Sequence, residues 1–360
     1  MSTDKRLVAT YTVVHGTAEF VCAFTLFSWV RAWGLGLDTI LVYSVVAFGF
    51  PLVMAVLGLN VLRNVPEGRI GLAGTVLMAA GVLMCQWGWA CVVLLGLGSA
   101  LFHIAAGTAT LKQPRPGTSV GVFESLGAVG LSAGTILGAG VWNALTPTPW
   151  VYAGSVILIG GFFVLAWGTP APGTVPVPVP SSTQLSTPFS TQRDWSLSGT
   201  GWIPLAVIAG LALVSVIRAV AGFTIPQPWK AGNGIVLVAA VFVALGRAVG
   251  GVIADKIGFV VPAIIGFVGA AILLIWPNSA TAGLFGVFFL ALPMAPVILA
   301  LLRSTARPAI SFGLAQFFQV PAAFASGILW GPWVVFATLL ICAVVMFVCR
   351  PLERRENVSP

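Results

Sequence analysis

Charged residues are scarce in this chain of 360 amino acids, at 7% of the total. A soluble domain carries about a quarter charged residues, so this composition excludes a water-soluble globular protein. Hydrophobic residues make up 58% of the sequence. They recur in apolar runs of about 20 residues, and each run is long enough to cross a bilayer as a helix. We therefore expect an all-α membrane protein.

Histidine is rarer still, with two residues, and cysteine has five. The two histidines lie far apart in the sequence, which argues against a metal site, and the cysteines show neither metal-ligand spacing nor a disulfide framework. No phosphate-cradling loop of the Gly-Lys-Ser/Thr type occurs, so ATP is not expected to drive the protein. We expect no cofactor, no metal and no enzymatic activity, because no polar catalytic cluster can be assembled.

Twelve apolar runs predict membrane-spanning helices. The run after the first six residues is too long for a signal-peptide core and is expected to be the first spanning helix. The predicted spans are 7–31, 38–63, 69–86, 88–112, 118–143, 149–168, 201–223, 233–253, 258–276, 280–303, 308–329 and 331–350.

The stretch between the sixth and seventh spans, residues 170–199, is rich in Pro, Ser and Thr. Such a composition predicts an extended linker rather than a helix. The linker divides the chain into an N-terminal bundle at 1–169 and a C-terminal bundle at 200–350. Each bundle has six predicted helices, and a tail follows at 351–360.

The net charge of +8 arises from basic residues in short loops between the apolar runs. This distribution is typical of the cytoplasmic loops of membrane proteins and does not indicate a nucleic-acid partner. With the N-terminus inside, only Arg31 and Lys230 of the 17 basic residues fall outside, and Arg218 lies within a helix. We expect both termini to be cytoplasmic, in a bacterial inner membrane.

Two segments of the chain resemble each other at a constant offset. RPGTSVGVFE at 115–124 and RPAISFGLAQ at 307–316 share Arg-Pro, Ser and Gly in one register and end in Glu124 and Gln316. Both segments open the fifth predicted helix of their half. Agreement at these positions without a gap indicates an internal duplication.

Three charges stand close together in GRAVGGVIADKIG, residues 246–258. Glycines let two helices approach closely, and Asp255 is able to cap the N-terminus of the next helix. With twelve predicted helices and a central linker, this stretch resembles the major facilitator superfamily. That family carries a loop of roughly Gly-x-x-x-Asp-Arg/Lys-x-Gly at this place, preceded by Gly-Arg.

The resemblance implies a major facilitator fold of two pseudo-symmetric six-helix bundles in a monomeric transporter. It also implies that the loop latches the two halves together in one state of the transport cycle; an ordinary tight loop is the alternative. The first-half counterpart at 54–71 lacks an acid at the expected place. The residues expected to form the latch are Gly246, Arg247, Gly251, Asp255, Lys256 and Gly258.

A narrower resemblance covers the fourth and fifth predicted helices. LGLGSALFHIAAG at 95–107, followed by a basic loop and a glycine-rich helix, is similar to the fosmidomycin-resistance branch of drug exporters. That branch has Phe-His at this place, usually followed by Pro and an acid, whereas Ile104 and Ala105 follow here. The resemblance implies a role for His103 in contacting substrate or protons; a packed histidine is the alternative.

His15 and Glu19 lie four residues apart near the middle of the first predicted helix, so they share one face. Ionisable side chains inside a membrane are costly and mark functional sites. A buried carboxyl group is able to bind and release a proton at working pH, and His15 could share that proton. A structural hydrogen-bonded pair is the alternative.

Four further polar residues are candidates for binding substrate. Glu124 is expected to pair with Lys112 or Arg115 or to face a central cavity, and Gln316 would be its neutral counterpart in the other half. Gln319 follows on the same helix. Arg218 is expected either to extend toward the membrane surface or to face the cavity, where it would pair with Glu19 or an anionic substrate.

These observations predict a proton-coupled secondary active transporter that works by alternating access, first of all an exporter of drugs or metabolites. Proton-coupled uptake of a small anionic metabolite is the alternative within transport. A non-transporting membrane sensor or assembly protein on the same fold is the alternative outside it. The expected partners are a small-molecule substrate, protons and the lipid bilayer.

Overall fold

The computed structural model describes residues 3–32, 37–61, 65–140, 202–224, 228–230, 232–324 and 331–354, and their regular structure is helical. Helices occupy every predicted span that the described residues include. The predicted span 149–168 and the linker at 170–199 lie outside the described residues. Seven helices of the described part are long and apolar enough to cross a membrane.

In the first half, helix bounds agree with the predicted spans to within a few residues. The second predicted span contains a π-helical turn, η1, between two α-helices. The elements are α1 (Thr3–Ala32), α2 (Leu37–Ser44), η1 (Val45–Gly49), α3 (Phe50–Val61), α4 (Glu67–Leu83), η2 (Cys85–Trp87), α5 (Trp89–Leu111) and α6 (Pro116–Gly140).

In the second half, two predicted spans are each divided into two helices. The elements are α8 (Trp202–Thr224), η3 (Pro228–Lys230), α9 (Asn233–Ile257), α10 (Val260–Leu274), α11 (Ala280–Ala291), α12 (Met294–Thr305), α13 (Pro308–Phe317), α14 (Val320–Phe324), α15 (Pro332–Val348) and α16 (Pro351–Arg354).

Proline accounts for both divisions. The backbone nitrogen of a proline cannot donate to the carbonyl four residues earlier, and the ring clashes with that carbonyl. The predicted span 280–303 is interrupted at residues 292–293, where Pro293 and Pro296 interfere with two successive turns. The span 308–329 is interrupted at residues 318–319, just before Pro321.

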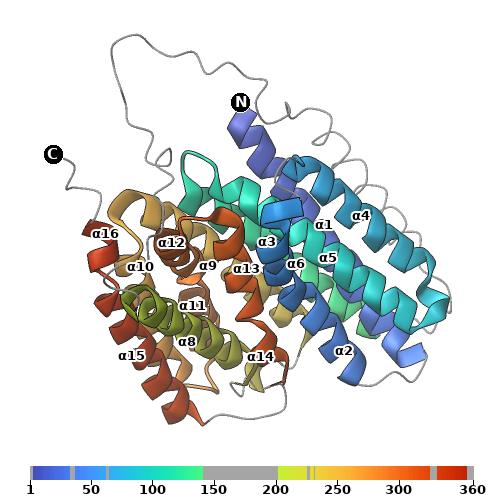
Figure 1. Cartoon of the computed structure of the whole chain (residues 1–360). Helices are drawn as coiled ribbons and strands as arrows, with labels where there is room; N and C mark the ends of the chain where they lie inside the picture. Colours follow the sequence, from blue (N-terminus) through green and yellow to red (C-terminus); the bar gives the residue numbers. More distant parts are fainter. Residues whose placement is uncertain are drawn as a thin grey trace.

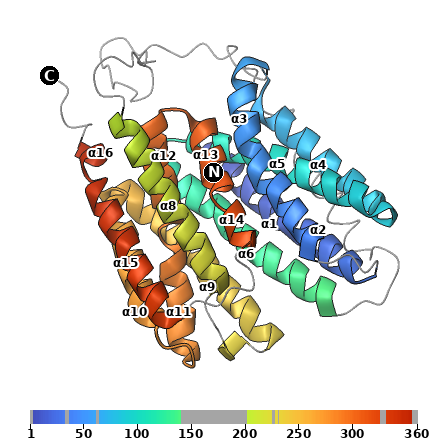
Figure 2. The same ribbon diagram turned by 60° about the horizontal axis from the view of Figure 1, so that its bottom comes forward.

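The described helices form two groups that lie side by side in both views (Figures 1 and 2). Within the first group α1 packs on α6 and α4 on α5, and within the second α10 packs on α15 and α11. Between the groups α6 packs against α9, and α13 packs against α3. The fifth span of each half thus meets the second span of the other, which is the arrangement that two pseudo-symmetric halves require.

Helices α1 and α6 approach each other along a row of glycines. A Cβ atom on Gly130 would lie 2.8 Å from the carbonyl carbon of Gly16 and even closer to its oxygen. One on Gly134 would lie 2.5 Å from the oxygen of Phe20. Small residues at helix crossings allow backbones to meet closely inside membranes. The position of α6 therefore depends on these glycines.

We predict that Gly130→Ala lowers the stability of the protein by about 1–3 kcal/mol, because the added methyl group meets backbone that cannot move aside. Thermal unfolding of the purified variant in detergent measures the effect. Gly234→Ala is the matched control: nothing lies within 4 Å of a Cβ atom at that position of α9. Equal melting temperatures for the two variants would contradict the prediction.

Candidate functional site

The stretch at 246–258, which contains the expected latch residues, is mostly helical. The predicted span ends at residue 253, but α9 continues to Ile257. Gly246, Arg247, Gly251, Asp255 and Lys256 therefore lie on the final turns of α9. Gly258 ends the helix with φ of +92°, a conformation that favours glycine.

Asp255 caps a helix in the opposite half of the protein, not the next helix along the chain. The backbone N–H of Gly117 donates to Oδ1 of Asp255 at 2.9 Å, and that of Thr118 donates to Oδ2 at 2.6 Å. Both donors belong to the first turn of α6, where the helix dipole favours a negative charge. The next helix, α10, is capped instead by Glu353, which accepts from the N–H of Val260 at 2.6 Å.

Glycines bring α6 and α9 together beside this cap. A Cβ atom on Gly121 would lie 2.6 Å from the carbonyl oxygen of Arg247 and 3.1 Å from Cα of Gly251. The carbonyl oxygen of Gly117 lies closer still to the Cβ position of Gly251. Of the expected latch residues, Arg247, Gly251 and Asp255 thus contact α6 of the other half. Gly246 instead packs against Phe288 of α11, Gly258 lies beside Glu353, and Lys256 is exposed.

Glu124 pairs across the two halves. Nη1 of Arg247 donates to the carbonyl oxygen of Glu124 at 2.8 Å and lies 3.3 Å from its Oε2. The expected partners Lys112 and Arg115 are not used; Lys112 instead forms an ion pair with Glu67. The pair is largely shielded from solvent, with 5% of the Glu124 side chain exposed and 17% of the Arg247 side chain.

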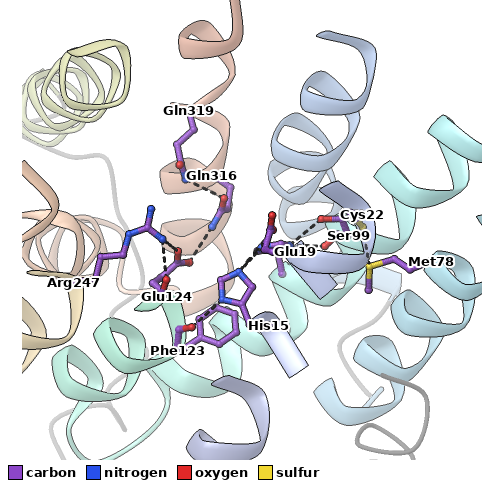
Figure 3. Close-up of polar contacts among 11 residues, drawn as sticks. His15, Glu19, Cys22, Met78, Ser99, Phe123, Glu124, Arg247, Gln316 and Gln319 are labelled. Carbon is purple, nitrogen blue, oxygen red and sulfur yellow. Dashed lines mark hydrogen bonds and ion pairs between the residues drawn. The ribbon is translucent and has the colours of Figure 1, made fainter. Parts of the chain in front are cut away.

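The two glutamines extend this cluster. Nε2 of Gln316 donates to Oε1 of Glu124 at 3.2 Å, and Nε2 of Gln319 donates to Oε1 of Gln316 at 3.0 Å. Figure 3 shows Arg247 and Gln316 both pointing toward Glu124. Glu124 and Gln316 lie 192 residues apart and are counterparts in the internal repeat. Their direct contact places them at the pseudo-twofold axis that relates the halves.

A second buried cluster joins His15, Glu19 and His103. Nε2 of His103 lies 3.0 Å from Nε2 of His15 and 3.2 Å from Oε1 of Glu19, and His15 Nε2 lies 3.8 Å from the same oxygen. The exposed fractions of these residues are 1%, 7% and 2%, in chain order. The sequence did not predict a contact between His103 and the pair on α1, but α5 brings His103 against both residues. The separation of the two histidines in sequence therefore no longer argues against a metal site.

Backbone carbonyls fix the outer nitrogen of each histidine. Nδ1 of His15 donates to the carbonyl oxygen of Phe123 on α6 at 2.8 Å (Figure 3). Nδ1 of His103 donates to the carbonyl oxygen of Ser99, one turn earlier on α5, at 2.8 Å. The sequence did not predict the roles of Ser99 and Phe123, because every residue type has a backbone carbonyl and the acceptor therefore cannot be recognised from residue identity.

The shape of α6 also accommodates the His15 ring. The ring stacks on that of Phe123, with centroids 4.4 Å apart and planes at 18°. Gly127 lies one turn further along, and a Cβ atom there would lie 2.9 Å from Nδ1 of His15 and closer to other ring atoms. A side chain at residue 127 would thus displace the imidazole.

Arg218 lies on α8 and is 8% exposed, so it does not extend into water. The ion pair expected with Glu19 is not formed, since the carboxylate of Glu19 faces the two histidines. No ion pair joins Arg218 to any residue in the described ranges. Arg247 and Glu124 are close enough for their charges to act on it.

The helical arrangement matches known transporter structures over nearly its whole length. No protein-family model matches the chain, and no curated protein matches its sequence. Among solved structures, the major facilitator superfamily transporter FucP in the outward conformation is similar, with a TM-score of 0.62 and 14% identity. The similarity covers 96% of this chain and 98% of the other.

A variant of the Escherichia coli fucose:proton symporter FucP is also similar, with a TM-score of 0.60, 14% identity and the same coverage. The chain therefore has the major facilitator fold, as the resemblance implied, with its two pseudo-symmetric bundles. The narrower resemblance to the fosmidomycin-resistance branch stays a prediction.

We predict that Asp255→Asn weakens the contact between the halves, because the substitution removes the charge that faces the N-terminus of α6. A cysteine placed at residue 118 should then react faster with a membrane-impermeant thiol reagent in inside-out vesicles. Lys256→Gln is the control, since Lys256 neighbours Asp255 but is exposed. Labelling rates that rise equally in both variants would rule out a latching role for Asp255.

We also predict that Arg247→Met destabilises the protein by about 3–5 kcal/mol, because it leaves the carboxylate of Glu124 buried without its cation. The double variant Glu124→Gln with Arg247→Met should recover much of this loss. Denaturation midpoints of the single and double variants measure both effects. A double variant no more stable than Arg247→Met would show that the pair is not the source of the loss.

Proposed function

We propose that this protein is a proton-coupled secondary active transporter of a small molecule that works by alternating access. The observation that carries the proposal is the buried cluster of His15, Glu19 and His103 inside a major facilitator fold. Ionisable groups at such depth are costly and mark ion or proton pathways. The fucose:proton symporter, a protein of the same fold, is named for this type of coupling.

Helix α6 offers a route from the proton-binding cluster to the interface between the halves. Its Phe123 carbonyl accepts a hydrogen bond from His15, and the next residue, Glu124, pairs with Arg247 and Gln316 of the other half. A change of protonation at His15 alters the charge beside this backbone segment. We propose that the segment transmits the change to the Glu124 pair and thereby favours one of the two conformations.

The described arrangement corresponds in this proposal to the state closed at the cytoplasmic side. The Asp255 cap and the glycine contacts hold α6 and α9 together at the ends that the distribution of basic residues assigns to the cytoplasm. Opening this side requires both hydrogen bonds to Asp255 to break. The outward conformation of the similar FucP structure is the same kind of state.

In this proposal the substrate binds near the axis between the halves, where Glu124, Gln316 and Gln319 lie. It also contacts His103, which lies beside Glu19. Export of a drug or metabolite is the first candidate. Transport of a small anionic metabolite is the second, and it is favoured by the buried guanidinium of Arg218, which forms no ion pair with a described residue. The proposal includes a monomer with both termini cytoplasmic in a bacterial inner membrane, and bundles at 1–169 and 200–350.

Proteoliposomes that contain a trapped pH dye test this function. We expect the wild type to show proton flux that depends on one compound from a panel of drugs and metabolites. Glu19→Gln should reduce that flux to the level of empty liposomes, because an amide does not take up a proton. Asp38→Asn, which removes an exposed carboxylate on α2, should leave the flux unchanged.

Equal flux in the wild type and in Glu19→Gln would move the coupling site elsewhere. An absence of flux with every compound, in protein that is folded, would favour a sensor or assembly protein. Engineered cysteines that react from only one side of the membrane would support that second outcome, because a transporter alternates its access.

A further inference from the structure

The His15, Glu19 and His103 cluster presents three hydrogen-bond acceptors to one another. A carbonyl oxygen can only accept, so the contacts with Phe123 and Ser99 place a hydrogen on Nδ1 of each imidazole. In a neutral ring, Nε2 then carries a lone pair, and the carboxylate of Glu19 carries no hydrogen either. Acceptors 3.0–3.8 Å apart repel each other unless a positive species lies between them.

We propose that His15, His103 and Glu19 bind a divalent transition-metal ion of the zinc class between Nε2 of the two imidazoles and Oε1 of the carboxylate. These three residues form a group whose ligand atoms converge, and all three are buried. The inference goes beyond the proposed function, because a metal site does not require transport.

The distances between the ligand atoms fit such an ion. Zinc binds imidazole nitrogen and carboxylate oxygen at about 2.0–2.2 Å in tetrahedral geometry, which places neighbouring ligand atoms roughly 3.3 Å apart. The three separations here are 3.0, 3.2 and 3.8 Å. A small contraction of the longest edge and small expansions of the other two give one triangular face of the tetrahedron.

The groups behind the ligands are those that metal-binding histidines require. A ligating histidine almost always donates its other ring N–H to a carboxylate, a carbonyl or water, which fixes the tautomer and the orientation of the ring. His15 and His103 both donate to backbone carbonyls, and His15 is further held against the ring of Phe123. The cluster therefore has oriented ligands before any ion arrives.

The ligand types select the class of metal. Two imidazoles and one carboxylate suit zinc and its transition-metal neighbours, whereas magnesium and calcium prefer oxygen ligands. Three protein ligands leave the fourth position of a tetrahedral ion open, as in zinc sites that exchange a ligand. Because metal ligands must be deprotonated, the ion and the protons of the proposed coupling site are alternative occupants.

Equilibrium binding to the purified full-length protein tests the inference, with any histidine tag removed. We expect one Zn²⁺ per chain in competition with a chromogenic zinc chelator, and no displacement by millimolar Mg²⁺. Co²⁺ bound at the same site should give the intense visible absorption of a tetrahedral complex. Glu19→Gln and His103→Gln should each weaken binding at least tenfold, whereas Glu67→Gln, which removes a carboxylate outside the cluster, should not.

Several outcomes would overturn the inference. One is a wild type that binds no Zn²⁺ at micromolar concentration, and another is binding that persists in His103→Gln. Because a variant could lose binding by unfolding, melting temperatures accompany each measurement: Zn²⁺ should raise that of the wild type and leave that of Glu19→Gln unchanged. An equal rise in both would also count against the site.

The outcome is separable from the test of the proposed function, since binding in detergent involves no flux. Substrate-dependent proton flux without zinc binding would retain the transporter and reject the metal site. Zinc binding without any proton flux would retain the metal site and reject the transporter. If both are found, proteoliposomes that contain a zinc-sensitive dye tell whether the bound ion is itself carried across the membrane; carried or retained, its binding supports the site.

Discussion

The close packing of α6 between α1 and α9 is the constraint on which both polar clusters depend. Glycines on one side of α6 allow it to meet α1, and Gly117 and Gly121 on another side allow it to meet α9 of the opposite half. Only backbone at such short range lets the Phe123 carbonyl reach His15 while the adjacent Glu124 reaches Arg247. Each glycine contact is small, but together they fix the separation of two clusters that share one helix.

The bilayer explains why the buried ionisable residues gather in these two clusters. Inside the hydrocarbon layer an unpaired polar group cannot form a hydrogen bond with water. Each buried ionisable side chain therefore needs a partner in the protein. Glu124 has Arg247 and Gln316, and Glu19 has His103 and His15. Arg218 differs, since no described residue forms an ion pair with it.

Local patterns in the sequence predicted the parts of this structure that depend on local chemistry. Apolar runs located the helices, and spacing placed His15 and Glu19 on one face of α1. The resemblance of the stretch at 246–258 to a family loop implied a contact between halves. Each of these inferences rests on residues within a few turns of one another.

Partners that lie far apart in the chain could not be predicted in this way. The pattern indicated that Asp255 caps a helix but not that the helix is α6, 138 residues away from it at Gly117. Glu124 was expected either to pair with nearby basic residues or to face a cavity, whereas its partner Arg247 lies 123 residues later. The contact between His15 and His103 spans 88 residues, and the distance in sequence was itself taken as evidence against a metal site.

The contact between Glu124 and Gln316 has a consequence for the ancestry of the chain. A residue on a twofold axis meets its own copy. In a dimer of two identical six-helix chains, two identical side chains would therefore face each other at this place. Two glutamates in that place could not both be ionised without repulsion. Two copies that are joined in one gene are free of this restriction, because each copy can mutate alone. Here a glutamate faces a glutamine, and only one half supplies an arginine. A duplicated gene can encode this asymmetric combination, whereas a symmetric dimer cannot.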